Sequence, residues 1–272
     1  MKLDEIRERW VASFSNPEAE INMWDNQAAM HKKKPLPSFD KHDFLQLLEA
    51  EKMLSPEYTS LDIGCGAGSL SIALAPRIKR AVGIDFAPGM IAVAKELAKE
   101  YGAKASFAVA NWSDPKFDLD EMGYRKAFDL VFAHMTPAIC DLRSLENMIE
   151  ASRKYCLISK PTRRRDSVLN QLEELVGIGV HTDNDDSVAY AFNALWTMGY
   201  EPKITYKKQL MTSSRPVETA VGYYLGRLSL EKNISAQDKE LVKEELCKIA
   251  VDGMVSEEMN TTKVTIYWEV TR

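Results

Sequence analysis

A glycine-rich turn and the acidic residues around it are the first features of this sequence that could do chemistry. The stretch LDIGCGAGS, residues 61–69, places glycine at positions 64, 66 and 68, and Asp62 lies just ahead of them in an apolar run. Glycine carries no side chain, so a turn of this composition lets a ligand approach the bare backbone. The helix expected after it adds unpaired N–H groups and the positive end of its dipole. We therefore expect a small-molecule site at this turn.

The spacing of these residues separates the ligand classes that use such a turn. A dinucleotide-binding turn favours G-x-G-x-x-G and a P-loop requires a lysine, and the turn here has neither feature. Asp85 follows 17 residues after Gly68, at the end of the next apolar run. A carboxylate at the tip of that strand can accept hydrogen bonds from both hydroxyls of a ribose. The alternative is that Asp85 only caps the helix that follows it.

These two motifs resemble those of the class I S-adenosylmethionine-dependent methyltransferases. LDIGCGAGS is similar to motif I of that family, and GIDFAPGMI, residues 83–91, carries Asp85 where the family places its ribose-binding acid. The resemblance has motif support over residues 50–160, and it implies S-adenosylmethionine as the cofactor. The cofactor contacts that it implies come from Asp62, Gly64, Cys65, Gly66, Gly68, Asp85, Phe86, Met90, Asn111, Trp112 and His134.

The last three of these residues follow later strands, where the motifs are weaker. Asn111 stands where the family often has an aspartate that accepts from the adenine amino group, and an amide oxygen can do the same. Trp112 could pack near the adenine or belong to the core. The sulfonium already activates the methyl group, so a base is needed only if the acceptor must lose a proton. His134 is the candidate catalytic base, and the alternative is a structural or cofactor-contacting histidine.

Short apolar runs alternate with amphipathic helical patterns from residue 59 onward. We expect strands at 59–63, 81–85, 105–109, 127–133 and 155–160, with helices between most of them. This alternation predicts βαβ crossovers and a parallel sheet. The resemblance adds that the fold is a Rossmann-like α/β sheet of seven strands, mostly parallel. Its last strand, expected in KVTIYWEV at 263–270, would be antiparallel.

Both ends of the chain lie outside the core that the motifs define. The expected regions are an N-terminal helical cap segment at 1–50, the cofactor-binding core at 51–212, a helical insertion at 213–262 and the final strand at 263–272. In the family that it resembles, such additions commonly form a substrate lid. The candidate lid or substrate residues are Trp24, Met30, Tyr223 and Tyr224. The alternatives are that these side chains pack in a core and that the insertion forms a homodimer surface.

Composition narrows the class of partner. The 272 residues carry a formal net charge of −5, which gives no general attraction to nucleic acid. The N/D-P-P-Y motif of nucleic-acid amino-methylating enzymes is absent, and the basic run at 163–165 is expected to be a solvated loop. No apolar run suits a membrane span and the N-terminus lacks a signal peptide, so we expect a cytoplasmic protein. Four scattered cysteines predict reduced thiols and no metal site.

These patterns favour an enzyme that methylates a small-molecule acceptor. Methylation of tRNA or protein is the alternative activity, and a non-catalytic regulator that binds S-adenosylmethionine is the third interpretation. No motif identifies the acceptor. The remaining histidines add little, because His31 is expected at an exposed edge and His42 and His181 have no supporting context.

Overall fold

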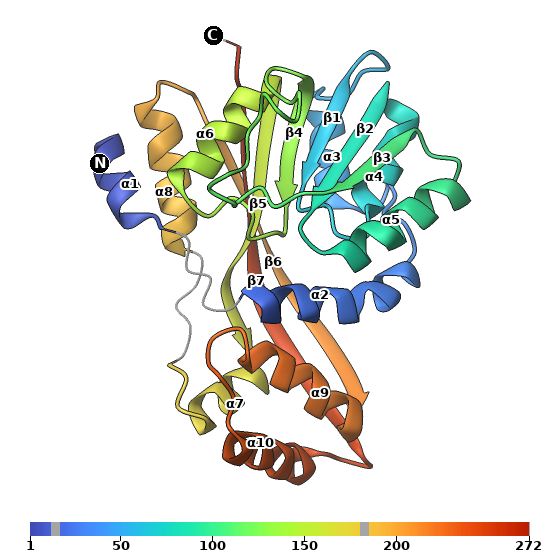
Figure 1. Cartoon of the computed structure of the whole chain (residues 1–272), viewed down its shortest axis with the longest axis vertical. Helices are drawn as coiled ribbons and strands as arrows, with labels where there is room; N and C mark the ends of the chain where they lie inside the picture. Colours follow the sequence, from blue (N-terminus) through green and yellow to red (C-terminus); the bar gives the residue numbers. More distant parts are fainter. Residues whose placement is uncertain (12–16, 180–184, 272) are drawn as a thin grey trace.

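Seven strands form a single mixed sheet within residues 1–11, 17–179 and 185–271, which are the residues that the computed structural model describes. The sheet order is β3-β2-β1-β4-β5-β7-β6 (Figure 1). The strands are β1 (Thr59–Ile63), β2 (Arg80–Asp85), β3 (Ala105–Val109), β4 (Phe128–His134), β5 (Ser152–Asp166), β6 (Lys203–Pro216) and β7 (Met254–Glu269). The first five strands pair in parallel, and β7 runs antiparallel to both β5 and β6. The expected Rossmann-like sheet with an antiparallel last strand is confirmed.

Helices cover both faces of this sheet. They are α1 (Leu3–Arg9), α2 (Pro17–Lys32), α3 (Asp43–Ala50), α4 (Ser69–Leu74), α5 (Pro88–Glu100), α6 (Leu142–Ala151), α7 (Leu169–Leu175), α8 (Asp185–Thr197), α9 (Val217–Leu228) and α10 (Ala236–Ile249), with a short 3-10 helix at Ala75–Arg77. No helix in the described ranges combines the length and the apolar character that crossing a bilayer requires.

Alternation along the central strands sends neighbouring side chains to opposite faces. On one face, Phe132 of β4 packs against Phe44 of α3, and their ring centroids are 5.3 Å apart. On the other face, Val131 belongs to the cluster that contains Ile6 of α1 and Leu195 of α8. Each helix therefore buries one apolar stripe against the sheet, and the strand ends stay free to carry polar residues.

A second, smaller core lies where β5, β6 and β7 extend beyond the other strands (Figure 1). Helices α7, α9 and α10 pack together there, around Leu172, Tyr224 and Leu246. The final strand is longer than expected, because β7 begins at Met254 rather than at residue 263. The basic run at 163–165 also differs from the expectation, since it lies inside β5 and not in a loop after it.

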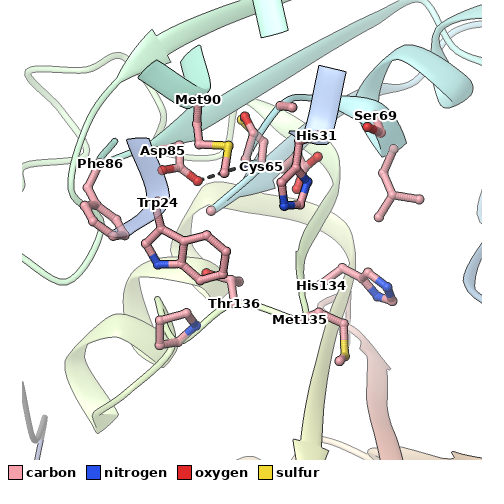
Figure 2. A pocket seen from close by; sticks show the side chains of 16 residues that line it. Trp24, His31, Cys65, Ser69, Asp85, Phe86, Met90, His134, Met135 and Thr136 are labelled. Atoms are coloured by element: carbon pink, nitrogen blue, oxygen red, sulfur yellow. Dashed lines mark hydrogen bonds between the residues drawn. The ribbon is translucent and has the colours of Figure 1, made fainter. Parts of the chain in front are cut away.

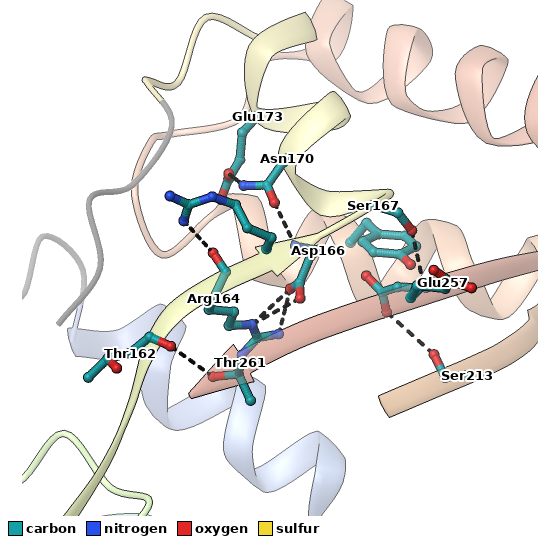
Figure 3. A network of polar contacts seen from close by, with 12 residues as sticks. Thr162, Arg164, Asp166, Ser167, Asn170, Glu173, Ser213, Glu257 and Thr261 are labelled. Atoms are coloured by element: carbon teal, nitrogen blue, oxygen red, sulfur yellow. Dashed lines mark hydrogen bonds and ion pairs between the residues drawn. The ribbon is translucent and has the colours of Figure 1, made fainter. Parts of the chain in front are cut away.

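Buried charged residues fix this extension of the sheet (Figure 3). Arg164 donates to Asp166 through two nitrogens, with an Nη2 to Oδ2 distance of 2.6 Å. On the next strand pair, Glu257 accepts from Ser213 and Arg215 at 3.4 Å each. Asp166 and Glu257 are each 3% exposed, so each carboxylate needs these donors to offset its lost hydration. The network accounts for the arginines at 164 and 215 as structural residues.

Candidate functional site

A pocket opens at the carboxyl ends of β1, β2 and β4, where ligands of open parallel sheets bind (Figure 2). Its volume is about 240 Å³. The lining residues are Trp24, His31, Asp62, Gly64, Cys65, Gly66, Ala67, Ser69, Leu70, Asp85, Phe86, Met90, His134, Met135, Thr136 and Pro137. Nine residues predicted from the sequence are therefore brought together, namely Trp24, Asp62, Gly64, Cys65, Gly66, Asp85, Phe86, Met90 and His134.

Asp85 ends β2 with its carboxylate held from two sides. The backbone N–H of Gly66 donates to Oδ2 at 2.8 Å, and that of Ala87 donates to Oδ1 at 2.9 Å. The N-cap of α5 is Ala87, so capping alone does not explain Asp85. Burial raises the pKa of Asp85, and the two N–H donors act against that rise. Each carboxylate oxygen keeps acceptor capacity, which suits a ligand with two neighbouring hydroxyls.

Two of the glycines in the loop are needed for different reasons. Gly66 and Gly68 both have positive φ, at 53° and 75°, a region that disfavours other residues. A Cβ at Gly68 would lie 2.5 Å from the Phe107 ring, so this glycine permits packing. A Cβ at Gly66 would meet no protein atom within 4 Å. Gly66 lines the pocket, so the space beside it is available to a ligand.

Asp62 supplies a second buried carboxylate to the same pocket. Its Oδ2 accepts from the hydroxyl of Ser71 at 2.9 Å, and the residue is 2% exposed. Burial raises the pKa of Asp62 to about 7, and the nearby charge of Asp85 acts in the same direction. A cationic ligand group in the pocket would reverse this effect, because it stabilises the charged carboxylate. The cofactor end of the pocket is therefore prepared for positive charge.

Helix α2 is the part of the N-terminal segment that reaches the pocket. It contributes Trp24 and His31 to the lining and packs Ala28 against α5. The carboxylate of Asp25 accepts from the backbone N–H of Gly89 in the first turn of α5, at 2.7 Å. Since α5 begins just after Asp85, this bond ties the cover of the pocket to the strand end that carries the buried acid.

His134 lies at the pocket wall next to the α3 side of the sheet. Its ring centroid is 4.5 Å from that of Phe44 and 5.6 Å from that of His42. Burial lowers the pKa of His134 to about 3, and the positive charge of Lys263 adds to the effect. The imidazole is therefore neutral at physiological pH and is a weak proton acceptor. This environment favours a ligand-contacting histidine over the general base that the sequence suggested.

Asn111 and Trp112 do not line the pocket. The amide oxygen of Asn111 accepts from the backbone N–H and the hydroxyl of Ser113, at 3.1 and 2.8 Å. Trp112 is 2% exposed, and its indole N–H donates to the carbonyl of Ser144 at 3.0 Å. The tryptophan is thus a core residue of the α6 side of the sheet. Its indole packs there because β3 delivers it to that face.

The insertion does not bring its tyrosines to the pocket either. Tyr224 is fully buried in the second core, and Tyr223 packs under the guanidinium of Arg215, with 3.9 Å from Cζ to the ring centroid. Met30 is also absent from the lining and is 53% exposed. His181 lies outside the described residues. Of the two expected halves of the lid, only the N-terminal one lines the pocket.

Several lining residues carry no sequence signal that would have found them. His31 was expected at an exposed edge, yet it is half-buried against the pocket. Ser69 and Leu70 begin α4, and residues 135–137 follow β4. Their position directly after the glycine loop and the fourth strand is the one signal available. Asp25 has none, because its partner Gly89 is 64 positions away.

A family model described as "Methyltransferase domain" matches residues 61–156. This segment contains the glycine loop, Asp85 and His134, and the sheet around it has the expected order. The chain belongs to the class I S-adenosylmethionine-dependent methyltransferases. That family uses S-adenosylmethionine as its methyl donor.

Individual relatives match parts of this methyltransferase chain. The release factor glutamine methyltransferase of Geobacter sulfurreducens is 29% identical over 118 residues, which are 42% of this chain and 38% of that protein. The magnesium-protoporphyrin O-methyltransferase of Rhodobacter capsulatus is 35% identical over 80 residues, 29% of this chain and 35% of that protein. The chain thus spans little more than a third of the length of these relatives.

A solved structure supports the fold over most of the methyltransferase chain. The YcgJ protein of Bacillus subtilis aligns with a TM-score of 0.50 and 16% identity, over 82% of this chain and 96% of that one. The residues at the pocket also fit the family's cofactor. The open space beside Gly66 leaves the backbone free for a ligand, and two buried carboxylates suit a molecule that carries hydroxyls and positive charge.

Proposed function

We propose that this chain transfers the methyl group of S-adenosylmethionine to a small-molecule acceptor. The observation that carries the proposal is the Asp85 carboxylate, which is buried, raised in pKa and fixed beside the open Gly66 backbone. A buried acid in an empty, apolar setting would be costly, so its conservation of both acceptor oxygens for a ligand supports ribose binding. Two curated relatives named as methyltransferases support the reaction class.

Three groups of the chain would hold the cofactor. Asp85 would accept from the ribose hydroxyls, the loop around Gly66 would lie against the ligand, and Asp62 would pair with its ammonium group. When bound, S-adenosylmethionine supplies a methyl group that the sulfonium activates for in-line displacement. The protein's part is to orient the acceptor and keep water out. Trp24 from α2 and Met90 from α5 supply apolar surface for that purpose.

Protein methylation is the second candidate. The relative from Geobacter sulfurreducens is named for a glutamine in a release factor. In the present chain, the residues that follow β4 read HMTP at 134–137 instead of an N/D-P-P-Y motif. Helix α2 also contributes side chains to the pocket lining, which leaves a protein side chain less direct access. We therefore place a small molecule ahead of a protein substrate.

Binding and turnover test the proposal in two stages. Calorimetry should show that S-adenosylhomocysteine binds the wild type and that Asp85→Ala weakens binding by about 2 kcal/mol, the value for hydrogen bonds to a charged group. Asp114→Ala, which removes an exposed acid, is the control. A screen of small acceptors that follows S-adenosylhomocysteine release then tests turnover. Unchanged affinity in Asp85→Ala would refute the assignment, whereas binding with methylation of protein acceptors alone would favour the second candidate.

A further inference from the structure

Lys160 lies beside the pocket in a position that the cofactor does not explain. It belongs to β5, and the preceding residue, Ser159, accepts a hydrogen bond at 2.8 Å from the backbone N–H of Met135. Met135 lines the pocket just after β4. Lys160 therefore sits at the same carboxyl edge of the sheet, one strand further from the ribose end. This is the side on which an acceptor would meet the cofactor.

The ammonium group of Lys160 is buried without a counter-charge. The residue is 5% exposed, and within the described ranges no hydrogen bond or ion pair engages its side chain. Burial lowers the pKa of Lys160 to about 8, and only the thiol of Cys140 acts against that change. A buried, unpaired ammonium is costly, and lysine is almost never buried without a partner. Such a group is expected to have a partner that the protein alone does not contain.

Lys263 shows how the same fold treats a buried lysine whose role is structural. It is 6% exposed, close to the value for Lys160, but its Nζ lies 2.6 Å from the carboxylate of Asp43. The two lysines are one register step apart on neighbouring strands, since Lys160 pairs with Val264. Burial at this level of the sheet is thus compatible with an ion pair. Lys160 lacks one even though Lys263 has it.

The charges around the pocket divide into two halves. The ribose end carries the buried acids Asp62 and Asp85, whose pKa values are raised. The other end carries Lys160 and a histidine, His134, whose pKa Lys263 helps to lower. A cation is favoured at the first end and an anion at the second. Since the cofactor satisfies the first end, the second is left for the acceptor.

We propose that Lys160 binds an anionic oxygen group of the methyl acceptor, so that the acceptor is an organic acid. This inference rests on the proposed function, because it assigns the acceptor half of the same site. A carboxylate beside Lys160 would form a charge-assisted hydrogen bond and would restore the ammonium to its ordinary protonation. The substrate class follows from the charge of the site and not from its shape.

Matched acids and amides provide the test. Benzoate and benzamide, and hexanoate and hexanamide, are titrated by calorimetry into protein saturated with S-adenosylhomocysteine. We expect at least one acid to bind at least tenfold more tightly than its amide. Lys160→Met should remove that preference, because methionine fills similar space without charge. Lys160→Arg should retain part of it. Lys208→Met, which removes one exposed positive charge on β6, should leave acid binding unchanged.

Two further readouts separate this inference from its rivals. Binding of S-adenosylhomocysteine to Lys160→Met should match the wild type, so a loss of cofactor binding in the wild type would count against the proposed function instead. Thermal unfolding of Lys160→Met should not be lower than that of the wild type, since an apolar residue replaces a buried charge. A purely structural lysine would lower it. No binding by either acid, or equal acid and amide binding, would overturn the inference.

Discussion

The carboxylate of Asp25 on α2 accepts a hydrogen bond of 2.7 Å from the backbone N–H of Gly89, in the first turn of α5. The contact is tight, because a Cβ at Gly89 would lie 2.7 Å from the same oxygen. A negative charge at a helix N-terminus is stabilised by the unpaired N–H groups and the helix dipole. The bond therefore fastens the N-terminal cover of the pocket to the helix that follows Asp85.

Removal of this bond should loosen α2 and weaken cofactor binding. A hydrogen bond to a charged group contributes roughly 1.5 kcal/mol or more, so we expect Asp25→Ala to reduce affinity for S-adenosylhomocysteine about tenfold. Hydrogen exchange should rise in α2 and stay unchanged in α9 and α10. The control is Lys32→Ala, which removes an exposed ion pair to Glu96 between the same two helices and should cost little. Equal effects of the two substitutions would contradict the prediction.

The two glycines at positions 66 and 68 should respond differently to alanine. Gly68→Ala places a Cβ against the Phe107 ring, so we expect a loss of stability of about 2 kcal/mol or more. Gly66→Ala carries only the backbone cost of a left-handed residue, about 1 kcal/mol, but puts a methyl group into the space for the ligand. Urea unfolding should separate the stabilities, and calorimetry should show the larger binding loss in Gly66→Ala. The reverse order would mean that the space beside Gly66 is not used.

Asp62 should make the stability of the ligand-free protein fall as pH rises. Its carboxyl has a pKa of about 7 in the folded chain, against about 3.9 for an unfolded aspartate. Between these values the folded state binds more protons than the unfolded state, so the free energy of unfolding decreases from about pH 4 to about pH 7. Asp62→Asn should remove this part of the slope and be at least about 1 kcal/mol more stable at pH 7.5.

Urea unfolding at pH 5 and pH 7.5 measures this difference for both proteins. Asparagine keeps an oxygen that can accept from Ser71, so the substitution changes charge more than packing. Ser71→Ala serves as a control for loss of that hydrogen bond alone, and it should shift both pH values together. Parallel pH profiles for the wild type and Asp62→Asn would show that Asp62 is ionised in the folded state and would exclude the linkage.

The order of strands and the position of the glycine loop were determined by local sequence. The alternation of apolar runs and helical patterns specifies βαβ units, and parallel strands end at one edge, so Gly66 and Asp85 had to meet there. Local spacing also predicted α9, whose bounds agree with the sequence pattern. These features depend on neighbours within one turn or one strand–helix unit, which a single sequence contains.

Tertiary structure alone decided which distant side chains reached the pocket and which buried charges found partners. His31 reached the lining and Tyr224 was buried in a separate core, although both lie on helices outside the predicted core. Lys263 pairs with Asp43 across 220 positions of sequence, while Lys160 is buried without a partner. Burial and ion pairing depend on how helices and strands pack in space, and the period of a helix or strand does not encode that packing.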